Sequence, residues 1–164
     1  METELSKLKR HYLFTILFTL IWLLLFYSIA YADILITKLD DVTISTANTG
    51  RDTIITERFC VASDPVGLYG LIALGSGRNG EFVLENGPFQ IDFEVSYRDK
   101  VSGGGFVDIL PNVPVNGFLT RPLRNNQTCA GNHGRLKIII RKSSINQAAA
   151  GLYRGSIQLS VIPE

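Results

Sequence analysis

The chain has 164 residues, of which 46% are hydrophobic and 19% charged, and its formal net charge is +1. This composition is too apolar for a disordered chain and fits a single globular domain. A nearly neutral chain without a basic helical stretch argues against nucleic acid as a partner.

The N-terminal segment has the order of regions found in a secretory signal peptide. A polar start with three cationic side chains leads into an uncharged apolar run over residues 13–30. The run closes with Ala30 and Ala32, which form the small-x-small pattern of a cleavage site directly before Asp33. We therefore expect cleavage after Ala32.

The apolar run is also close to the length that spans a bilayer, so a retained membrane anchor is the alternative. Removal of residues 1–32 as a signal peptide leaves one exported domain, residues 33–164, with no stable membrane insertion. No repeat or low-complexity tract in the sequence indicates a second domain.

Cys60 and Cys129 are the only cysteines. In an oxidising compartment such a pair is expected to form one structural disulfide. A metal site needs more ligands than these two cysteines and His133 can offer, so no metal is predicted. His133 lies in a Gly/Asn-rich turn and is interpreted as a solvated loop residue.

After residue 32, short apolar or alternating runs recur between Gly, Asn, Asp and Pro, which is typical of strands. The predicted strands are residues 34–44 (broken near 40–41), 53–62, 68–74, 81–86, 89–99, 135–142 and 156–161. The clearest alternation places Phe89, Ile91, Phe93, Val95 and Tyr97 on one face. Prolines confine residues 106–134 to edge strands and loops, and residues 143–151 form a turn or short helical link. Seven or eight strands at this spacing predict an all-β, antiparallel β-sandwich.

Gly75, Gly77 and Gly80 match the G-x-G-x-x-G pattern of dinucleotide sites. That pattern requires a following helix, whereas strand-like residues follow here, so a hairpin turn is the better interpretation. Since the sequence offers no constellation of nucleophile, base and carboxylate, we predict no enzyme, no catalytic residue and no cofactor.

Charge is divided unevenly along the chain. Residues 33–108 hold 12 acidic and 6 basic side chains, whereas residues 109–164 hold 7 basic ones against Glu164 alone. We expect strands of the two halves to interleave and their charges to pair across the sheets. Head-to-tail complementarity between copies is the alternative.

The last predicted strand has no following hairpin to supply a neighbour. Such a strand pairs within its own sheet or leaves an edge that a partner's strand completes. An A-G-x-Y turn at residues 150–153 precedes it, and Ile157, Leu159 and Val161 alternate within it. Together with the signal peptide, the β-rich pattern and the cysteine pair, this end resembles subunits of chaperone–usher pili of Gram-negative bacteria, in the branch related to spore coat protein U domains.

The resemblance implies an immunoglobulin-like fold that lacks its final strand, leaving an apolar groove beside the C-terminal strand. Tyr153, Ile157, Leu159 and Val161 would line this groove. A periplasmic chaperone would fill it first and anchor the C-terminal carboxylate of Glu164. At the outer-membrane usher, another pilus subunit would replace the chaperone. The protein would then pass through the periplasm to the cell surface.

Two features depart from the family pattern. Little sequence separates Ala32 from the first predicted strand, so Ile34 and Ile36 fit either a donor segment or the first strand of the domain. A subunit without a donor suits a tip or minor position. Cys129 also comes later than the second cysteine of many pilins. A self-contained binding module for a carbohydrate or host surface, and a membrane-anchored periplasmic β-domain, are the competing hypotheses.

Mass spectrometry of the exported protein tests the predicted processing. We expect Asp33 as the first residue, because the A-x-A site ends at Ala32. A product that still begins with Met1 would support the retained anchor instead.

Overall fold

The structure is a computed structural model, and it describes residues 16, 18, 33–37, 50–124, 128–129 and 131–164. The chain divides into two compact units, Met1–Tyr31 and Ala32–Glu164, and all strands belong to the second. The proposed cleavage residues Ala30 and Ala32 lie outside the described residues. Among the residues described, no helix combines the length and hydropathy needed to cross a bilayer.

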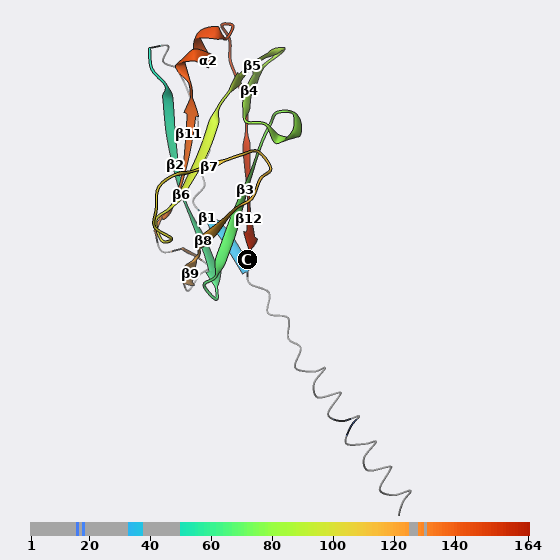
Figure 1. The fold of residues 1–164 in the computed structure, drawn as a ribbon, viewed down its shortest axis with the longest axis vertical. Coiled ribbons are helices and arrows are strands. Elements are labelled where there is room, and N and C mark those ends of the chain that lie inside the picture. The colour runs from blue at the N-terminus through green and yellow to red at the C-terminus, as the bar shows by residue number, and fades with distance from the viewer. Residues whose placement is uncertain (1–15, 17, 19–32, 38–49, 125–127, 130) are drawn as a thin grey trace, which may run out of the picture. The chain divides into compact units, whose positions relative to one another are not determined.

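The second unit is built almost entirely from antiparallel strands (Figure 1). Its larger sheet has the order β10-β9-β2-β11-β6-β7, with β1 paired to β2. These strands are β1 (Asp33–Thr37), β2 (Thr53–Asp64), β6 (Glu94–Asp99), β7 (Val107–Ile109), β9 (Arg121–Arg124), β10 (Thr128–Cys129) and β11 (Gly134–Ile140). Only β2 and β9 pair in parallel among the described strands. The all-β class predicted from the alternating runs is thereby confirmed.

A smaller sheet has the order β12-β3-β8, and a separate hairpin joins β4 to β5. The remaining elements are β3 (Leu68–Gly75), β4 (Val83–Asn86), β5 (Phe89–Asp92), β8 (Val115–Leu119), β12 (Ile157–Pro163), the 3₁₀ turn η1 (Arg78–Gly80) and the helix α2 (Lys142–Gln147). The short helix falls within the link predicted at residues 143–151, one residue earlier at its start.

An aromatic layer joins the two sheets. Tyr69 of β3 and Tyr97 of β6 are fully buried, and their hydroxyl oxygens lie 2.6 Å apart in a hydrogen bond. The Tyr97 ring also meets Phe118 of β8 edge-on, with ring centroids 4.8 Å apart. Burial raises the pKa of both phenols, so both stay neutral and each satisfies the other. Both sheets therefore share one apolar core.

The strands predicted at residues 53–62 and 68–74 are present as β2 and β3. The single strand predicted at residues 89–99 is wrong: it divides into β5 and β6 at Phe93, whose N–H donates to the Phe82 carbonyl. This break lets β5 pair with β4 while β6 pairs with β11. Phe89, predicted to share one face with Ile91 and Phe93, is half exposed at the start of β5, whereas those two are buried.

The hairpin turn predicted at the G-x-G-x-x-G glycines is also wrong. These glycines connect β3 to β4, which belong to different sheets. Asn79 and Gly80 take positive φ values of 60° and 84°. A Cβ at Gly75 would overlap the Glu81 carbonyl, so this position requires glycine for the chain to cross closely between sheets.

The Tyr69–Tyr97 pair is testable by a double-mutant cycle. Tyr69→Phe should lower the free energy of unfolding by about 1–3 kcal/mol, because it leaves the Tyr97 hydroxyl buried without a partner. Tyr69→Phe with Tyr97→Phe should recover most of that loss. Urea unfolding of the three variants measures both steps, and strictly additive losses would contradict the assignment.

Candidate functional site

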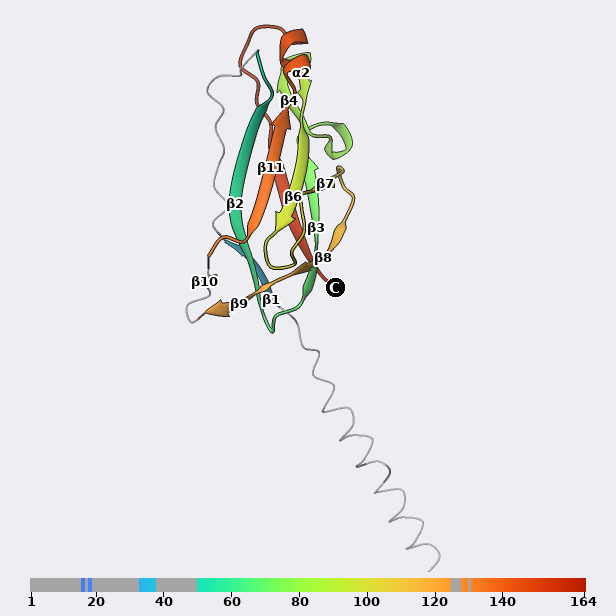
Figure 2. The ribbon, with the colours of Figure 1, turned by 60° about the vertical axis from the view of Figure 1, so that its left-hand side comes forward.

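The final strand ends the smaller sheet and pairs on one side only. β12 runs antiparallel to β3 from Ile157, opposite Gly75, to Pro163, opposite Tyr69 (Figure 2). No other strand pairs with β12 among the residues that the structure describes. Its second row of backbone N–H and C=O groups is therefore an open edge within that part of the chain.

The side of β12 that faces the core carries the three predicted groove residues. Ile157, Leu159 and Val161 alternate along the strand, pack against the core and stay only partly buried. On the neighbouring strand, Ala73 opposite Leu159 and Leu71 opposite Val161 are fully buried. The apolar side chains of β12 are thus less buried than those of β3 opposite them.

The turn before β12 is fixed by the β4–β5 hairpin. Backbone hydrogen bonds of 2.7 and 3.0 Å join Glu85 to Arg154 in both directions. A Cβ at Gly151 would meet the side-chain amide of Asn86, which packs closely against this turn. Tyr153 packs against the core, and its hydroxyl donates to the Ala149 carbonyl at 2.9 Å. The predicted groove residue Tyr153 therefore lies near the entry of β12.

The last residue is held at the opposite end of the same strand. The backbone N–H of Glu164 donates to the Leu68 carbonyl at 3.1 Å. Its side-chain oxygen Oε1 accepts from the Gly117 N–H at 2.7 Å. Glu164 thus lies against both β3 and β8.

The predicted disulfide is present between Cys60 of β2 and Cys129 of β10, with their Cα atoms 6.1 Å apart. Both cysteines are buried and form a small cluster with Ala62 and Leu123. The bond ties the short β9–β10 pair to β2, and it closes a loop between residues 69 positions apart.

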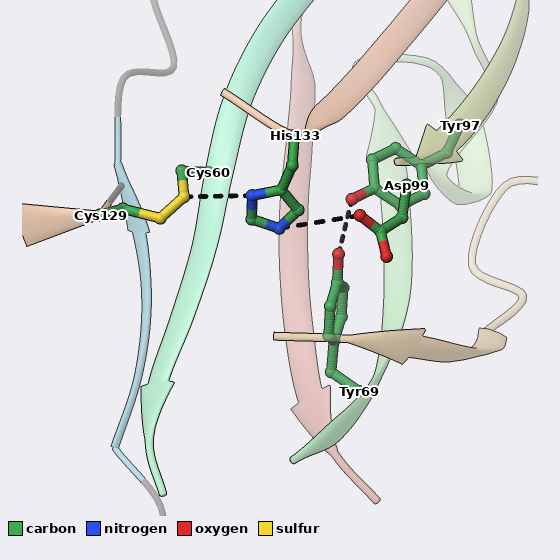
Figure 3. Close-up of a disulfide and its surroundings, with 6 residues drawn as sticks. All are labelled: Cys60, Tyr69, Tyr97, Asp99, Cys129 and His133. Atoms are coloured by element: carbon green, nitrogen blue, oxygen red, sulfur yellow. Dashed lines mark hydrogen bonds and ion pairs between the residues drawn. A yellow bond between two sulfur atoms is a disulfide. The ribbon is translucent and has the colours of Figure 1, made fainter. Parts of the chain in front are cut away.

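His133 lies directly beside the disulfide (Figure 3). Its side chain is buried, with the residue only 3% exposed. Nδ1 lies 3.2 Å from Cys60 Sγ, and Nε2 lies 3.8 Å from Asp99 Oδ1. The interpretation of His133 as a solvated loop residue is therefore wrong. Gly and Asn neighbours report a turn in the backbone, but they do not report which way the side chain points.

Burial lowers the pKa of His133, the Asp99 carboxylate opposes this shift, and Arg121 adds to it. The imidazole is accordingly neutral near pH 7. A disulfide sulfur carries no proton, so it can only accept in this contact, from Nδ1 in the tautomer protonated there.

Asp99 is a buried carboxylate that sequence reasoning missed. It accepts hydrogen bonds from the backbone N–H groups of Val101 and Ser102 and from the Ser102 hydroxyl. An Asp followed by Ser three residues later is the local signal that indicates such a capped turn. Asp99 thereby stabilises the turn after β6 and places its carboxyl group near His133.

The disulfide and His133 also bring three metal-ligating atoms together. Among the described residues, these atoms of Cys60, Cys129 and His133 all lie within 4.8 Å of one another. Metal binding by cysteine requires thiolates. Both sulfurs are joined in the disulfide, so these ligands are unavailable while the bond is intact. The cluster acts as a covalent crosslink packed against a neutral imidazole.

The described residues thus offer two sites of different kinds: an open sheet edge at β12 and a buried crosslink at His133. No protein-family model and no curated protein matches the chain.

The buried imidazole predicts a specific dependence of stability on pH. The pKa of His133 is lowered in the folded chain from its usual 6.5, so the unfolded chain takes up a proton first as the pH falls. Stability should be level above about pH 6.5 and fall as the pH drops below that value. His133→Asn should remove this slope, since His133 is the sole histidine of residues 33–164. Urea titrations at each pH test this, and an unchanged slope in the variant would contradict it.

Proposed function

We propose that this chain is an exported, non-enzymatic subunit of a chaperone–usher pilus or a related surface assembly. Its partners complete the smaller sheet by adding a strand beside β12. The observation that carries the proposal is the one-sided pairing of β12, with Ile157, Leu159 and Val161 only partly buried. An added strand supplies backbone hydrogen bonds to the edge and apolar side chains to that row.

The strand order supports an immunoglobulin-like sandwich without its last strand. Immunoglobulin constant domains place strands A, B, E and D in one sheet and C, F and G in the other. Here β2, β11 and β6 follow the order B-E-D, β1 pairs with β2 as strand A does with B, and β3 with β12 follows C-F. Strand G would lie beside β12, where no strand is found among the described residues.

The position of β1 supports a tip or minor subunit. Residues 33–37 pair with residues 60–64 of β2, and Ile34 and Ile36 pack against the core. A first strand held inside its own domain does not serve as a donor to a neighbouring subunit. The chain therefore receives a strand without passing one on.

The proposed partners are a periplasmic chaperone, the outer-membrane usher and other pilus subunits. Glu164 supports chaperone anchoring, because it lies at the end of the open strand, with its N–H bonded to β3. The disulfide supports export, since such bonds persist in oxidising compartments. The protein would thus pass through the periplasm on its way to the surface.

A strand fused to the C-terminus tests the proposal. The full chain is extended beyond Glu164 by an Asn-Gly turn and a six-residue strand of alternating apolar residues, which can fold back along β12. We expect the free energy of unfolding to rise by about 3 kcal/mol, because the three partly buried side chains become covered. Urea unfolding measures the gain.

The matched control carries the same extension with its apolar residues replaced by serine, and it should give a much smaller gain. Production with and without the cognate periplasmic chaperone adds a second measurement, in which we expect poor recovery of monomer when the chaperone is missing. Equal stability of both extended chains, together with full recovery of a stable monomer alone, would refute the proposal.

A further inference from the structure

Three arginines lie side by side across the larger sheet. Arg135 of β11 is opposite Arg58 of β2 on one side and opposite Arg98 of β6 on the other. Directly opposed residues of antiparallel strands have Cβ atoms about 5 Å apart. The three side chains, called here the arginine row, therefore begin within about 10 Å of one another.

The arginine row lies on the face turned away from the core. Its neighbours in sequence, Phe59 on β2, Tyr97 on β6 and Leu136 on β11, are buried in the core. Because side chains alternate along a strand, the arginines point to the opposite face. Arg58 is exposed, and Arg98 and Arg135 are partly exposed.

None of the ion pairs between described residues involves the arginine row. Nearby Glu94 is paired with Arg141, with Nε and Oε1 2.8 Å apart, and Asp99 is buried in its own turn. The Nε atoms of Arg98 and Arg135 are shielded from solvent and have no hydrogen-bond partner in the described part of the chain. Like charges directly opposite one another destabilise a sheet. Repulsion between the three guanidinium groups therefore opposes folding.

A fourth cation extends this surface. Lys137 lies two residues along β11, opposite Thr56 on one side and Ser96 on the other. Its amine sits 4.4 Å from the centre of the Phe106 ring, which holds the charge over the sheet. The face therefore carries positive charge along β11 as well as across it.

We propose that the arginine row and Lys137 bind the sulfate or phosphate ester groups of an acidic polysaccharide. Guanidinium groups donate paired hydrogen bonds to such oxyanions. The four cations are spread over an open sheet face. A ligand that repeats its negative charges along an extended chain fits this arrangement better than a single small anion does. Proteins that bind single-stranded nucleic acid add aromatic stacking platforms, and Phe106 is already covered by Lys137. The binding face lies on the sheet that does not contain β12, so it is independent of strand complementation.

Arg135→Gln tests the proposal, because Arg135 lies at the centre of the row. Calorimetry at physiological salt measures binding to a sulfated probe, a heparin dodecasaccharide, and to a phosphorylated one, phosphomannan. The protein is produced from the full chain and used as recovered, with any partner bound at β12. We expect the dissociation constant for the better of the two probes to rise about tenfold, and tighter binding of one probe identifies the ester group.

Arg78→Gln is the matched control, since Arg78 is exposed in η1 outside this face, and it should bind like the unmodified protein. Arg135→Gln should not lower the urea midpoint, because it relieves repulsion between like charges, so weaker binding would not reflect unfolding. Arg58→Gln should weaken binding in the same direction.

Failure of both probes to bind, equal losses in Arg78→Gln, or equally tight binding of single-stranded DNA would overturn the proposal. Self-association that Arg135→Gln abolishes, without saccharide binding, would assign the face to a second copy instead.

Discussion

The hydrogen bond between Tyr69 and Tyr97 is the constraint around which the rest of the chain is arranged. It crosses from β3 to β6 and therefore fixes the smaller sheet against the larger one. Phe59 and Phe118 pack against the Tyr97 ring from β2 and β8, so four strands meet at this one residue. Once this layer is in place, β12 must align along β3 with its apolar side chains toward the core.

That alignment leaves an energetic problem at the sheet edge. The backbone groups of an edge strand favour a second hydrogen-bonded neighbour, and β12 pairs with β3 alone within the described residues. Proteins commonly protect such edges with charged residues, bulges or proline. In β12 the only proline is Pro163, at its end, and no residue from Ile157 to Ile162 is charged. The strand therefore lacks the features that normally prevent a second chain from adding to it.

Local sequence patterns predicted much of this fold. Strands are indicated by the alternation of neighbouring residues, and the disulfide is indicated by a chemically distinctive residue that occurs only twice. The alternation at residues 53–62 and 68–74 predicted β2 and β3, and the sole cysteine pair predicted the disulfide. The division at Phe93 was not predictable in this way, because it depends on a change of partner from β4 to β11.

The candidate sites also divide into residues that a local pattern reveals and residues that only the tertiary fold brings together. Ile157, Leu159 and Val161 were found from their spacing, since alternation alone places them on one face. The buried position of His133 was missed because it depends on Cys60 and Asp99, both far from it in sequence. The arginine row is also invisible in sequence, since Arg58, Arg98 and Arg135 become neighbours only through the strand register.

The disulfide between Cys60 and Cys129 has a mechanical consequence. If the two ends of the chain are pulled apart, tension passes directly through the sulfur bridge, and the residues between the cysteines remain slack. A fully stretched chain gains about 3.3–3.6 Å per residue, so a loop spanning 69 positions withholds roughly 230 Å of length. Mechanical unfolding would therefore extend the chain only outside the disulfide loop. The strands β3 to β9 would bear no force while the disulfide is intact.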